Sequence, residues 1–253
     1  MPNDRPKQIW DAALLESVHG RTDKADRVRR MFDAIAPTYE RVNAWASLGQ
    51  DRVWRREMVR LAAVRPDDVL LDVASGTGDV LRAFSVADTR PAQLIGLDFS
   101  HAMLLRAARG PLAHCLFCQA DALAIPLPEQ SVSIVTCAFG IRNFQDLGAG
   151  FREMQRVLRP GGRVVLLEFS LPEHTLLRRM YLYYIQKLMP YFAGFLSGDR
   201  TGAYRYLPQS VVSFESSQAV RARMKTAGFS GITEYPLTGG VVTIYMARKS
   251  SGK

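Results

Sequence analysis

Short apolar runs alternate with amphipathic stretches along most of the chain. The runs have the length and residue types of buried strands, and the stretches carry apolar residues at helical spacing. The runs expected to form strands are Val69–Val73, Gln93–Leu97, Cys115–Gln119, Val132–Cys137 and Arg163–Phe169, with Gly231–Tyr235 and Val241–Ala247 as a closing hairpin. The stretches expected to form helices are Arg52–Ala63, 79–86, Ser100–Arg109, Leu147–Leu158 and Ser216–Ala227. Because strands that alternate with helices form parallel sheets, the pattern predicts an α/β fold with a doubly wound, mostly parallel sheet of about seven strands.

The chain before the first strand has a helical pattern. Apolar residues recur at helical spacing over Gln8–Val18 and over Lys24–Ile35. Pro37 ends the second of these helices, and a segment rich in aromatic and amide side chains follows. Its Tyr39, together with Trp54, either closes the core of an N-terminal helical layer or belongs to a lid over a site at the strand ends.

A second unusual stretch lies between residues 174 and 196, where aromatic side chains are crowded together with Leu and Met. The aromatic residues of this stretch are Tyr181, Tyr183, Tyr184, Tyr191, Phe192 and Phe195. The stretch is either a helix packed on the sheet or an apolar wall for a flat, hydrophobic substrate. The segment that follows, SGDRTGAYRYLPQSV, is expected to be a polar loop.

Size and composition indicate one globular domain. The chain has 253 residues, of which 47% are hydrophobic and 23% are charged. These proportions exclude a disordered chain and a repeat architecture. No apolar run reaches the ~18 residues of a membrane span, and the N-terminal MPNDRPKQIW lacks the apolar core of a signal peptide. We therefore expect a cytoplasmic protein.

The formal net charge of +9 is compatible with nucleic acid, with an anionic membrane surface or with solubility alone. The densest basic groups, Arg27–Arg30 and Arg52–Arg60, lie on amphipathic helical patterns without interleaved aromatic residues. This arrangement favours contact with a membrane surface over nucleic-acid binding, which we do not expect. The sequence leaves the oligomeric state open, and a homodimer is compatible with it.

Cysteine and histidine residues give little sign of a metal site. Cys115 and Cys118 form a CxxC pair, but they lie in a strand-like run and no second CxxC follows. Half-buried strand cysteines explain this pair better than zinc or redox chemistry does. The four histidines show no metal-ligand spacing, so no metal is predicted.

The run VLLDVASGTGD passes abruptly from a buried strand into closely spaced glycines. Gly76 and Gly78 permit a sharp turn and the close approach of a ligand to the backbone. Asp72 and Asp79 are polar groups at positions where core packing would not place them. A strand, a glycine turn and the start of a helix together form a site for a nucleotide-like ligand.

The end of the second strand carries a further acidic residue, Asp98. It lies about 20 residues beyond the glycine turn, which is the position that binds a ribose diol in such folds. Asp98 and Ser100 are equally compatible with a helix cap. The dinucleotide fingerprint requires a third glycine, and Leu81 occupies that position. This weakens the interpretation that the turn binds a nicotinamide cofactor.

The motifs taken together resemble those of a known family. DVASGTGD is similar to the first motif of class I S-adenosylmethionine-dependent methyltransferases. Along nearly the whole chain, VRRMFDAIAPTYERVN, GLDFS, FGIRNFQD, RVLRPGGRVVLLEFS and YRYLPQS resemble the ubiquinone/menaquinone biosynthesis C-methyltransferase family. The resemblance implies a Rossmann-like fold with an N-terminal helical lid and a helical insertion. It also implies S-adenosyl-L-methionine as cofactor and a polyprenylated quinol as substrate.

The resemblance also implies roles for individual residues and segments. The residues implied in binding or shaping the cofactor site are Asp72, Gly76, Thr77, Gly78, Asp98, Asp121, Ala122 and Ala138. Those implied on the substrate side are Tyr39, Asn43 and Tyr184, and those implied in catalysis are Arg142 and Asn143. The single domain is expected to comprise a lid (1–63), a cofactor-binding core (64–170), a substrate-side helical insertion (171–215) and a C-terminal helix with a strand hairpin (216–253).

Three positions depart from the pattern of that family. Ser75 stands where the family often has glycine, Glu40 where an aspartate follows the lid tyrosine, and Asp51 where a histidine is frequent. Ser75 is small enough to be tolerated. No role is assigned to Glu40 or Asp51.

A quinol ring carbon becomes nucleophilic only after an adjacent hydroxyl has lost its proton. The resemblance suggests that Arg142, a permanent cation, stabilises the resulting oxyanion, and that a water held by Arg142 and Asn143 takes the proton. The alternative is that Arg142 forms a structural ion pair with Asp98 or Asp121.

The leading hypothesis is methylation of demethylmenaquinol, with the ubiquinone precursor as a second acceptor. Two alternatives stay open: a methyltransferase for another small hydrophobic phenol or lipid, and a non-catalytic S-adenosylmethionine-binding subunit of a quinone-synthesis complex. Since a polyprenyl tail lies in the bilayer, we also expect peripheral contact with the inner face of a membrane.

Overall fold

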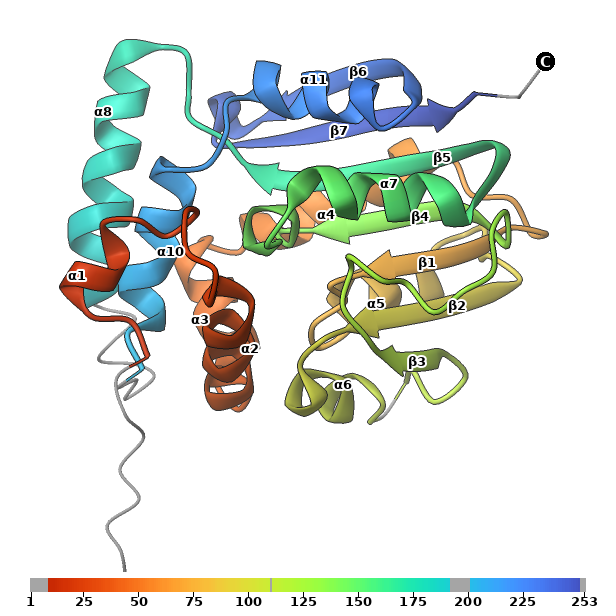
Figure 1. The fold of residues 1–253 in the computed structure, drawn as a ribbon, viewed down its shortest axis with the longest axis horizontal. Coiled ribbons are helices and arrows are strands. Elements are labelled where there is room, and N and C mark those ends of the chain that lie inside the picture. Colours follow the sequence, from red (N-terminus) through yellow and green to blue (C-terminus); the bar gives the residue numbers. More distant parts are fainter. Residues whose placement is uncertain (1–8, 110, 192–200, 251–253) are drawn as a thin grey trace, which may run out of the picture.

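A seven-stranded sheet forms the centre of the molecule in the computed structural model, which describes residues 9–109, 111–191 and 201–250 (Figure 1). The strand order is β3-β2-β1-β4-β5-β7-β6. The strands are β1 (Val69–Val73), β2 (Gln93–Asp98), β3 (Leu116–Gln119), β4 (Val132–Ala138), β5 (Leu158–Phe169), β6 (Phe229–Leu237) and β7 (Val242–Lys249). Strands β1 to β5 pair in parallel, whereas β7 is antiparallel to both β5 and β6. The predicted fold class is therefore confirmed.

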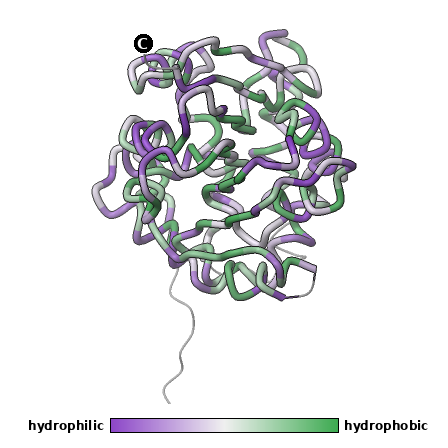
Figure 2. Tube along the Cα trace, turned by 90° about the vertical axis from the view of Figure 1, so that its right-hand side faces the viewer, coloured by the Kyte–Doolittle hydropathy of each residue, from purple (hydrophilic) through white to green (hydrophobic). Residues whose placement is uncertain are grey.

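Helices cover both faces of the sheet, with α7 and α11 in front of it and α4 and α5 behind it in Figure 1. Their bounds are α4 (Gln50–Ala62), α5 (Asp79–Ser85), α6 (His101–Ala107), α7 (Leu147–Val157) and α11 (Ser217–Thr226). Each face has its own apolar core, which includes Phe151 and Met224 on one side and Trp54 and Phe84 on the other. Figure 2 shows hydrophobic stretches running through the middle of the molecule and hydrophilic ones frequent at its edge. The central strands are buried on both sides, as parallel sheets require.

A second group of helices lies beyond the carboxyl ends of the parallel strands, at the left of Figure 1. These elements are α1 (Ala12–Leu15), α2 (Lys24–Ile35), α3 (Tyr39–Ala46), α8 (Thr175–Tyr183), the π-helical turn η2 (Tyr184–Leu188) and α10 (Ala203–Val212). Trp10, Val28 and Tyr206 pack together in its core. The strand order reverses between β1 and β4, so these helices stand over the crevice where open α/β sheets bind ligands.

The N-terminal helix is shorter than the apolar periodicity predicts. The expected helix over Gln8–Val18 is wrong: only α1 forms, because Asp11 caps it by accepting a hydrogen bond from the backbone nitrogen of Leu14. Before this cap, the backbone nitrogens of Ile9 and Trp10 donate to the carbonyl oxygen of Thr201, at 3.0 Å each. Gln8 itself lies outside the described residues.

The expected polar loop over SGDRTGAYRYLPQSV is also wrong from Ala203 onward, where α10 begins. Gly and Pro suggested a loop, and Pro208 does lie inside this helix. A proline there removes a hydrogen bond and costs about 3 kcal/mol. The burial of Tyr204, Tyr206 and Val211 outweighs this cost. Residues 192–200, with Phe192 and Phe195 of the aromatic stretch, lie outside the described residues.

Candidate active site

The glycine turn connects β1 to α5 through several backbone conformations that side chains disfavour. Ala74, Gly76 and Gly78 all have positive φ angles, of 56°, 55° and 86°. A Cβ on Gly78 would lie 2.5 Å from Leu112, so only glycine fits there. A Cβ on Gly76 would meet only the ring of Tyr39, at 4.0 Å. Gly78 therefore shapes the turn, whereas Gly76 presents its backbone to the space beneath Tyr39.

Asp98 links the end of β2 to this turn. Its Oδ2 accepts a hydrogen bond of 2.8 Å from the backbone nitrogen of Gly76, and its Oδ1 accepts one of 2.8 Å from that of Ser100. The side-chain hydroxyl of Ser100 caps α6, so the cap and the link coexist. Burial raises the pKa of Asp98 to about 6, because the charged carboxylate is removed from water.

Several buried polar atoms around the turn have no hydrogen-bond partner among the residues that the structure describes. These atoms are Asp72 Oδ2, Ser75 Oγ and Thr77 Oγ1. The other carboxylate oxygen of Asp72 accepts a bond of 2.7 Å from the hydroxyl of Thr136. Burial, with a smaller contribution from the neighbouring acids, raises the pKa of Asp72 to about 8. Because an unsatisfied buried polar group costs about 1–3 kcal/mol, this cluster fits a ligand with donor groups, such as the amino-acid end of S-adenosylmethionine.

Two pockets adjoin the glycine turn. The first is a narrow cavity of about 60 Å³ beneath α2 and α3. Of the residues implied by the resemblance, those that line it are Tyr39, Gly76, Asp98, Asp121, Ala122, Ala138 and Asn143. The resemblance implies a ribose at Asp98 and an adenine at Asp121 and Ala122, so we refer to this cavity as the cofactor pocket.

The second pocket is a larger, mostly apolar cavity of about 410 Å³. Its walls come from α3, α4, α8, η2 and α10, and its base includes Phe139 and Phe169. We refer to this cavity as the acceptor pocket, because the residues implied on the substrate side line it. The implied residues that line it are Tyr39, Asn43, Asp72, Gly76, Thr77, Ala138, Arg142 and Tyr184. Tyr39, Gly76 and Ala138 line both pockets, so the two adjoin at these residues. Gly78 lines neither.

Arg142 lies in η1 (Ile141–Asn143), after the end of β4, and is buried against the acceptor pocket. Its Nη1 donates to the carboxylate of Glu168 at 2.7 Å and to the carbonyl oxygen of Phe139. Its Nε has no partner, and the guanidinium lies 5.3 Å from the centre of the Phe169 ring. Burial, the largest single effect, would lower the pKa of this guanidinium, but Glu168 together with Tyr206 and Tyr39 offsets it, so the pKa is raised and Arg142 stays charged.

The alternative that Arg142 pairs with Asp98 or Asp121 is wrong, because its ion-pair partner is Glu168. Glu168 lies fully buried at the end of β5. Sequence reasoning did not assign it a role. The available signal was an acidic residue inside the otherwise apolar strand RVVLLEF, since a buried carboxylate needs a partner.

Asn143 and the two tyrosines have defined partners. The side-chain oxygen of Asn143 accepts a bond of 2.8 Å from the hydroxyl of Tyr206, and its side chain faces the cofactor pocket rather than the acceptor pocket. Tyr184 donates to the carbonyl oxygen of Ala46 at 2.8 Å, which joins η2 to α3. Tyr39 has a side-chain hydrogen bond with Asn43, and burial raises its pKa despite this bond, so its hydroxyl stays protonated.

The comparisons with known proteins agree with this geometry. A family model described as the ubiE/COQ5 methyltransferase family matches residues 21–249. The chain belongs to this family. A ubiquinone/menaquinone biosynthesis C-methyltransferase from Geotalea daltonii is 39% identical over 233 residues, which cover 90% of this chain and 98% of that protein. A demethylmenaquinone methyltransferase from Thermus thermophilus is 43% identical over 220 residues, which cover 85% and 98%.

Solved structures resemble the chain in fold at lower identity. A SAM-dependent methyltransferase from Thermotoga maritima has a TM-score of 0.61 at 16% identity, covering 88% of this chain and 99% of that one. The [4+2]-cyclase SpnF has a TM-score of 0.58 at 20% identity, covering 90% and 97%. A cyclase on this fold means that the fold alone does not decide the reaction. The sequence-based prediction of the methyltransferase family and of its S-adenosylmethionine-dependent chemistry is confirmed by the family match.

Two departures from the family pattern take part in an ion-pair network beside the site. Glu40 of α3 pairs with Arg82 of α5 at 2.8 Å, and Arg82 also bonds the carbonyl oxygen of Thr77 at 2.8 Å. Asp51 of α4 pairs with Arg55, which lies 3.7 Å from Asp79. These contacts join α3 and α4 to α5, the helix that starts from the glycine turn. The sequence did not reveal this function.

Proposed function

We propose that this chain methylates a ring carbon of a polyprenylated quinol in menaquinone or ubiquinone biosynthesis, with demethylmenaquinol as the first acceptor to test. The observation that carries the proposal is the position of Arg142, a buried cation at the acceptor pocket, which adjoins the cofactor pocket. The relatives named for these reactions and the family match support the same activity.

Different residues of the chain would bind the cofactor and the acceptor. S-adenosylmethionine supplies an electrophilic methyl group when bound, and the residues that would hold it are Asp98, Asp121 and the unpartnered atoms of Asp72 and Thr77. Phe139 and Phe169, with ring centres 4.6 Å apart and ring planes tilted by 34°, offer an apolar aromatic surface to a substrate ring. Alignment of the reacting groups in such a pocket can supply a large part of the rate enhancement.

Arg142 supplies the charge that the acceptor needs. Ionisation of a quinol hydroxyl places negative charge on oxygen and on the ring carbon, and a fixed cation stabilises it in a pocket with little water. The hydroxyl proton would pass to water, and the ring carbon would take the methyl group as its bond to sulfur breaks and S-adenosylhomocysteine leaves. The ring proton would then pass to water while the phenolate oxygen takes a proton back, so the aromatic quinol is restored and one proton is released in all. An arginine is too weak an acid to exchange its own proton at neutral pH, so its contribution is electrostatic.

The test is transfer of a radiolabelled methyl group from S-adenosylmethionine to short-chain acceptors. We expect labelling of a demethylmenaquinol, and a parallel assay with the ubiquinone precursor determines the branch. Labelling of a simple hydrophobic phenol or lipid in preference to both quinols would replace this function by a broader methyltransferase. Cofactor binding without any transfer would favour a non-catalytic subunit.

The mouth of the acceptor pocket suggests how a membrane-bound substrate enters. Leu48 and Met180 both line the pocket and are 75% and 60% exposed, so the pocket opens between them. Leu176 and Tyr183 extend this exposed apolar surface along α8, and exposed arginines such as Arg179 accompany it. Among the described residues no helix is long and apolar enough to cross a bilayer. We propose that this face contacts an anionic lipid surface, which suits apolar side chains flanked by arginine.

Vesicle sedimentation tests this contact. Vesicles with anionic lipid are expected to retain the protein more strongly than neutral ones, and the double substitution of Leu176 and Tyr183 by serine should weaken retention. Leu116→Ser, an equally exposed leucine on the distant strand β3, is the matched control. Self-association lost with the same double substitution, without any vesicle binding, would assign the face to a homodimer instead.

A further inference from the structure

The first residue of α2 is a buried lysine without an acidic partner. Lys24 is 2% exposed, and its Nζ donates to the carbonyl oxygen of Arg142 at 3.0 Å and to that of Phe144 at 2.6 Å. It also lies 3.2 Å from Nδ1 of His19. No carboxylate in the described part of the chain lies within ion-pair distance of it. Burial, followed by repulsion from Arg142, lowers the pKa of Lys24 to about 8.

Such a group destabilises the fold, because a buried ammonium loses its hydration and gains no opposite charge. An apolar side chain would fill the same space at lower cost. What Lys24 provides instead is two strong, charge-assisted hydrogen bonds to carbonyl groups. These carbonyls flank Asn143 within the FGIRNF segment that holds Arg142.

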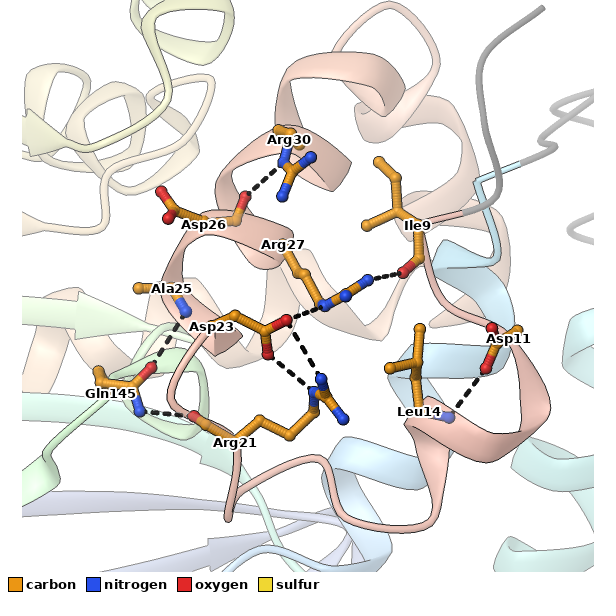
Figure 3. Close-up of polar contacts among 10 residues, drawn as sticks. All are labelled: Ile9, Asp11, Leu14, Arg21, Asp23, Ala25, Asp26, Arg27, Arg30 and Gln145. Atoms are coloured by element: carbon orange, nitrogen blue, oxygen red, sulfur yellow. Dashed lines mark hydrogen bonds and ion pairs between the residues drawn. The ribbon is translucent and has the colours of Figure 1, made fainter.

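The same segment is attached to α2 by a second contact, which Figure 3 shows. The side chain of Gln145 accepts a bond of 3.1 Å from the backbone nitrogen of Ala25 and donates one of 2.7 Å to the carbonyl oxygen of Arg21. Asp23, paired with Arg21 and Arg27, orders the turn before α2 (Figure 3). This second contact binds α2 to the loop without touching Arg142.

The backbone of Arg142 is thus held from two sides. Its nitrogen donates to Glu168 Oε2 at 3.2 Å, and Glu168 Oε1 accepts from its guanidinium. Its carbonyl oxygen accepts from Lys24. Glu168 belongs to the sheet and Lys24 to the N-terminal helices, so the cation is fixed between two layers that come from distant parts of the sequence.

We propose that Lys24 is a positioning residue for the methyl-transfer reaction, which holds the backbone of Arg142 so that its guanidinium faces the acceptor. The proposal rests on the function proposed above for Arg142. Ala25 and Phe32 of α2 line the cofactor pocket, so the helix that holds the backbone of Arg142 also borders the cofactor pocket.

The test compares Lys24→Met with Arg27→Met, which removes the bonds of α2 to Asp23 and to the carbonyl oxygen of Ile9. Lys24→Met is expected to lower kcat for a short-chain quinol by ~10-fold or more, because small displacements of a catalytic group have large effects. Its affinity for S-adenosylmethionine, measured by calorimetry, should change much less. Arg27→Met should leave kcat at saturating cofactor within about twofold of the wild type. Lys24→Gln, which keeps one donor, should lie between the wild type and Lys24→Met.

A double-mutant cycle with Arg142→Ala separates positioning from simple structural support. If Lys24 acts through Arg142, Lys24→Met causes no further loss of kcat in the Arg142→Ala background. Additive losses, or a Lys24→Met enzyme with normal kcat beside an inactive Arg142→Ala enzyme, would overturn the proposal. An active Arg142→Ala enzyme would instead remove the function proposed for Arg142, and absence of transfer by the wild type would remove the proposed activity. If Lys24→Met does not fold, the cycle is run with Lys24→Gln.

Discussion

Individual residues of the site that would bind the ligands also lower the stability of the fold, because they are ionisable groups that are buried. Asp72, Asp98 and Arg142 are all buried, and the pKa values of the two acids are raised by that burial. Their positions at strand ends were predictable, because acids after apolar runs are conspicuous. Their partners were not: nothing in the sequence spacing connects Arg142 to Glu168 or to Lys24, which come from β5 and α2.

The guanidinium of Arg142 should affect the transfer step rather than cofactor binding. We expect Arg142→Ala to lower turnover by ~10²-fold or more, as loss of a preorganised charge does, while affinity for S-adenosylmethionine stays nearly unchanged. Turnover is measured by methyl transfer and affinity by calorimetry. The control is Arg223→Ala, which replaces an exposed arginine of α11 that pairs with Glu215, and this variant should behave like the wild type. Equal turnover of the two variants would contradict the assignment.

Asp98 should make cofactor binding depend on pH. Its pKa is raised from 3.8 to about 6, so its contribution to cofactor affinity should fall as the carboxylate becomes protonated below pH 6. A change of affinity near pH 8 is expected from Asp72 instead, because burial raises the pKa of that carboxyl to about 8. The raised pKa of Asp98 makes folding less favourable as pH rises from 3.8 towards 6, because the folded form holds the proton more tightly than the unfolded form. Asp98→Ala should weaken binding at neutral pH by ~1–3 kcal/mol.

Calorimetric titrations at pH 5 to 8 test this dependence. In Asp98→Asn, which cannot ionise, the fall in affinity through pH 6 should disappear. A dependence that persists unchanged in Asp98→Asn would assign it to another group.

At the scale of elements, periodicity predicted the helices that have one apolar face. It failed to predict helices that form because of packing against distant parts of the chain. Lys24–Ile35 forms α2 with the expected bounds. The helix α10 was missed because Pro208 and Gly202 suggest a loop, and only the packing of Tyr206 against Trp10, at 4.6 Å between ring centres, reveals why a helix forms. The strand β5 begins at Leu158, so RPGG is part of an irregular strand and not only a helix end.

The end of α4 is joined to β5 by another buried arginine. Arg163 donates to the carbonyl oxygens of Ala62 and Ala63 and pairs with Asp68 at 2.7 Å. Arg163→Met should destabilise the fold by ~3–5 kcal/mol, because it leaves the Asp68 carboxylate buried without its ion-pair partner. Denaturant unfolding measures the change. Arg248→Met, on the neighbouring position of β7 but exposed, is the control, and a similar loss in both variants would contradict the explanation.

At the scale of the whole molecule, the sheet and the helices beyond it differ in predictability. The alternation of strands and helices was sufficient for the sheet, since parallel topology follows from local pattern. The arrangement of α1, α2, α3, α8 and α10 was not, because these helices contact one another across large sequence separations. Tyr39 lies beside Gly76 of the glycine turn and also packs against Phe32 in the N-terminal layer. Trp54 packs instead in the apolar core on one face of the sheet, so it does not close the core of that layer.

The helices α2 and α3 cover the cofactor pocket, so we expect them to move when the cofactor binds. The pocket has a volume of only about 60 Å³, and Asp72 and Thr77 line the larger cavity beside it. Hydrogen exchange should therefore be faster in α2 and α3 than in β1 and β4 of the free protein, and should slow in α2 and α3 on addition of S-adenosylhomocysteine. Mass spectrometry of peptides from these elements measures it. Unchanged exchange in α2 and α3 on binding would contradict the need for opening.

The aromatic base of the acceptor pocket has an optical consequence. Trp54 lies edge-on to Phe139 and Phe169, with ring centres 6.0 and 6.4 Å apart, and lines the pocket while its indole nitrogen donates to Thr238 at 2.8 Å. A ring bound against these two phenylalanines would lie beside an indole that is almost fully shielded from water. Trp54 is one of three tryptophans in the chain, so in a variant that lacks Trp10 and Trp45 the quenching of its fluorescence would report binding at the acceptor pocket without a label.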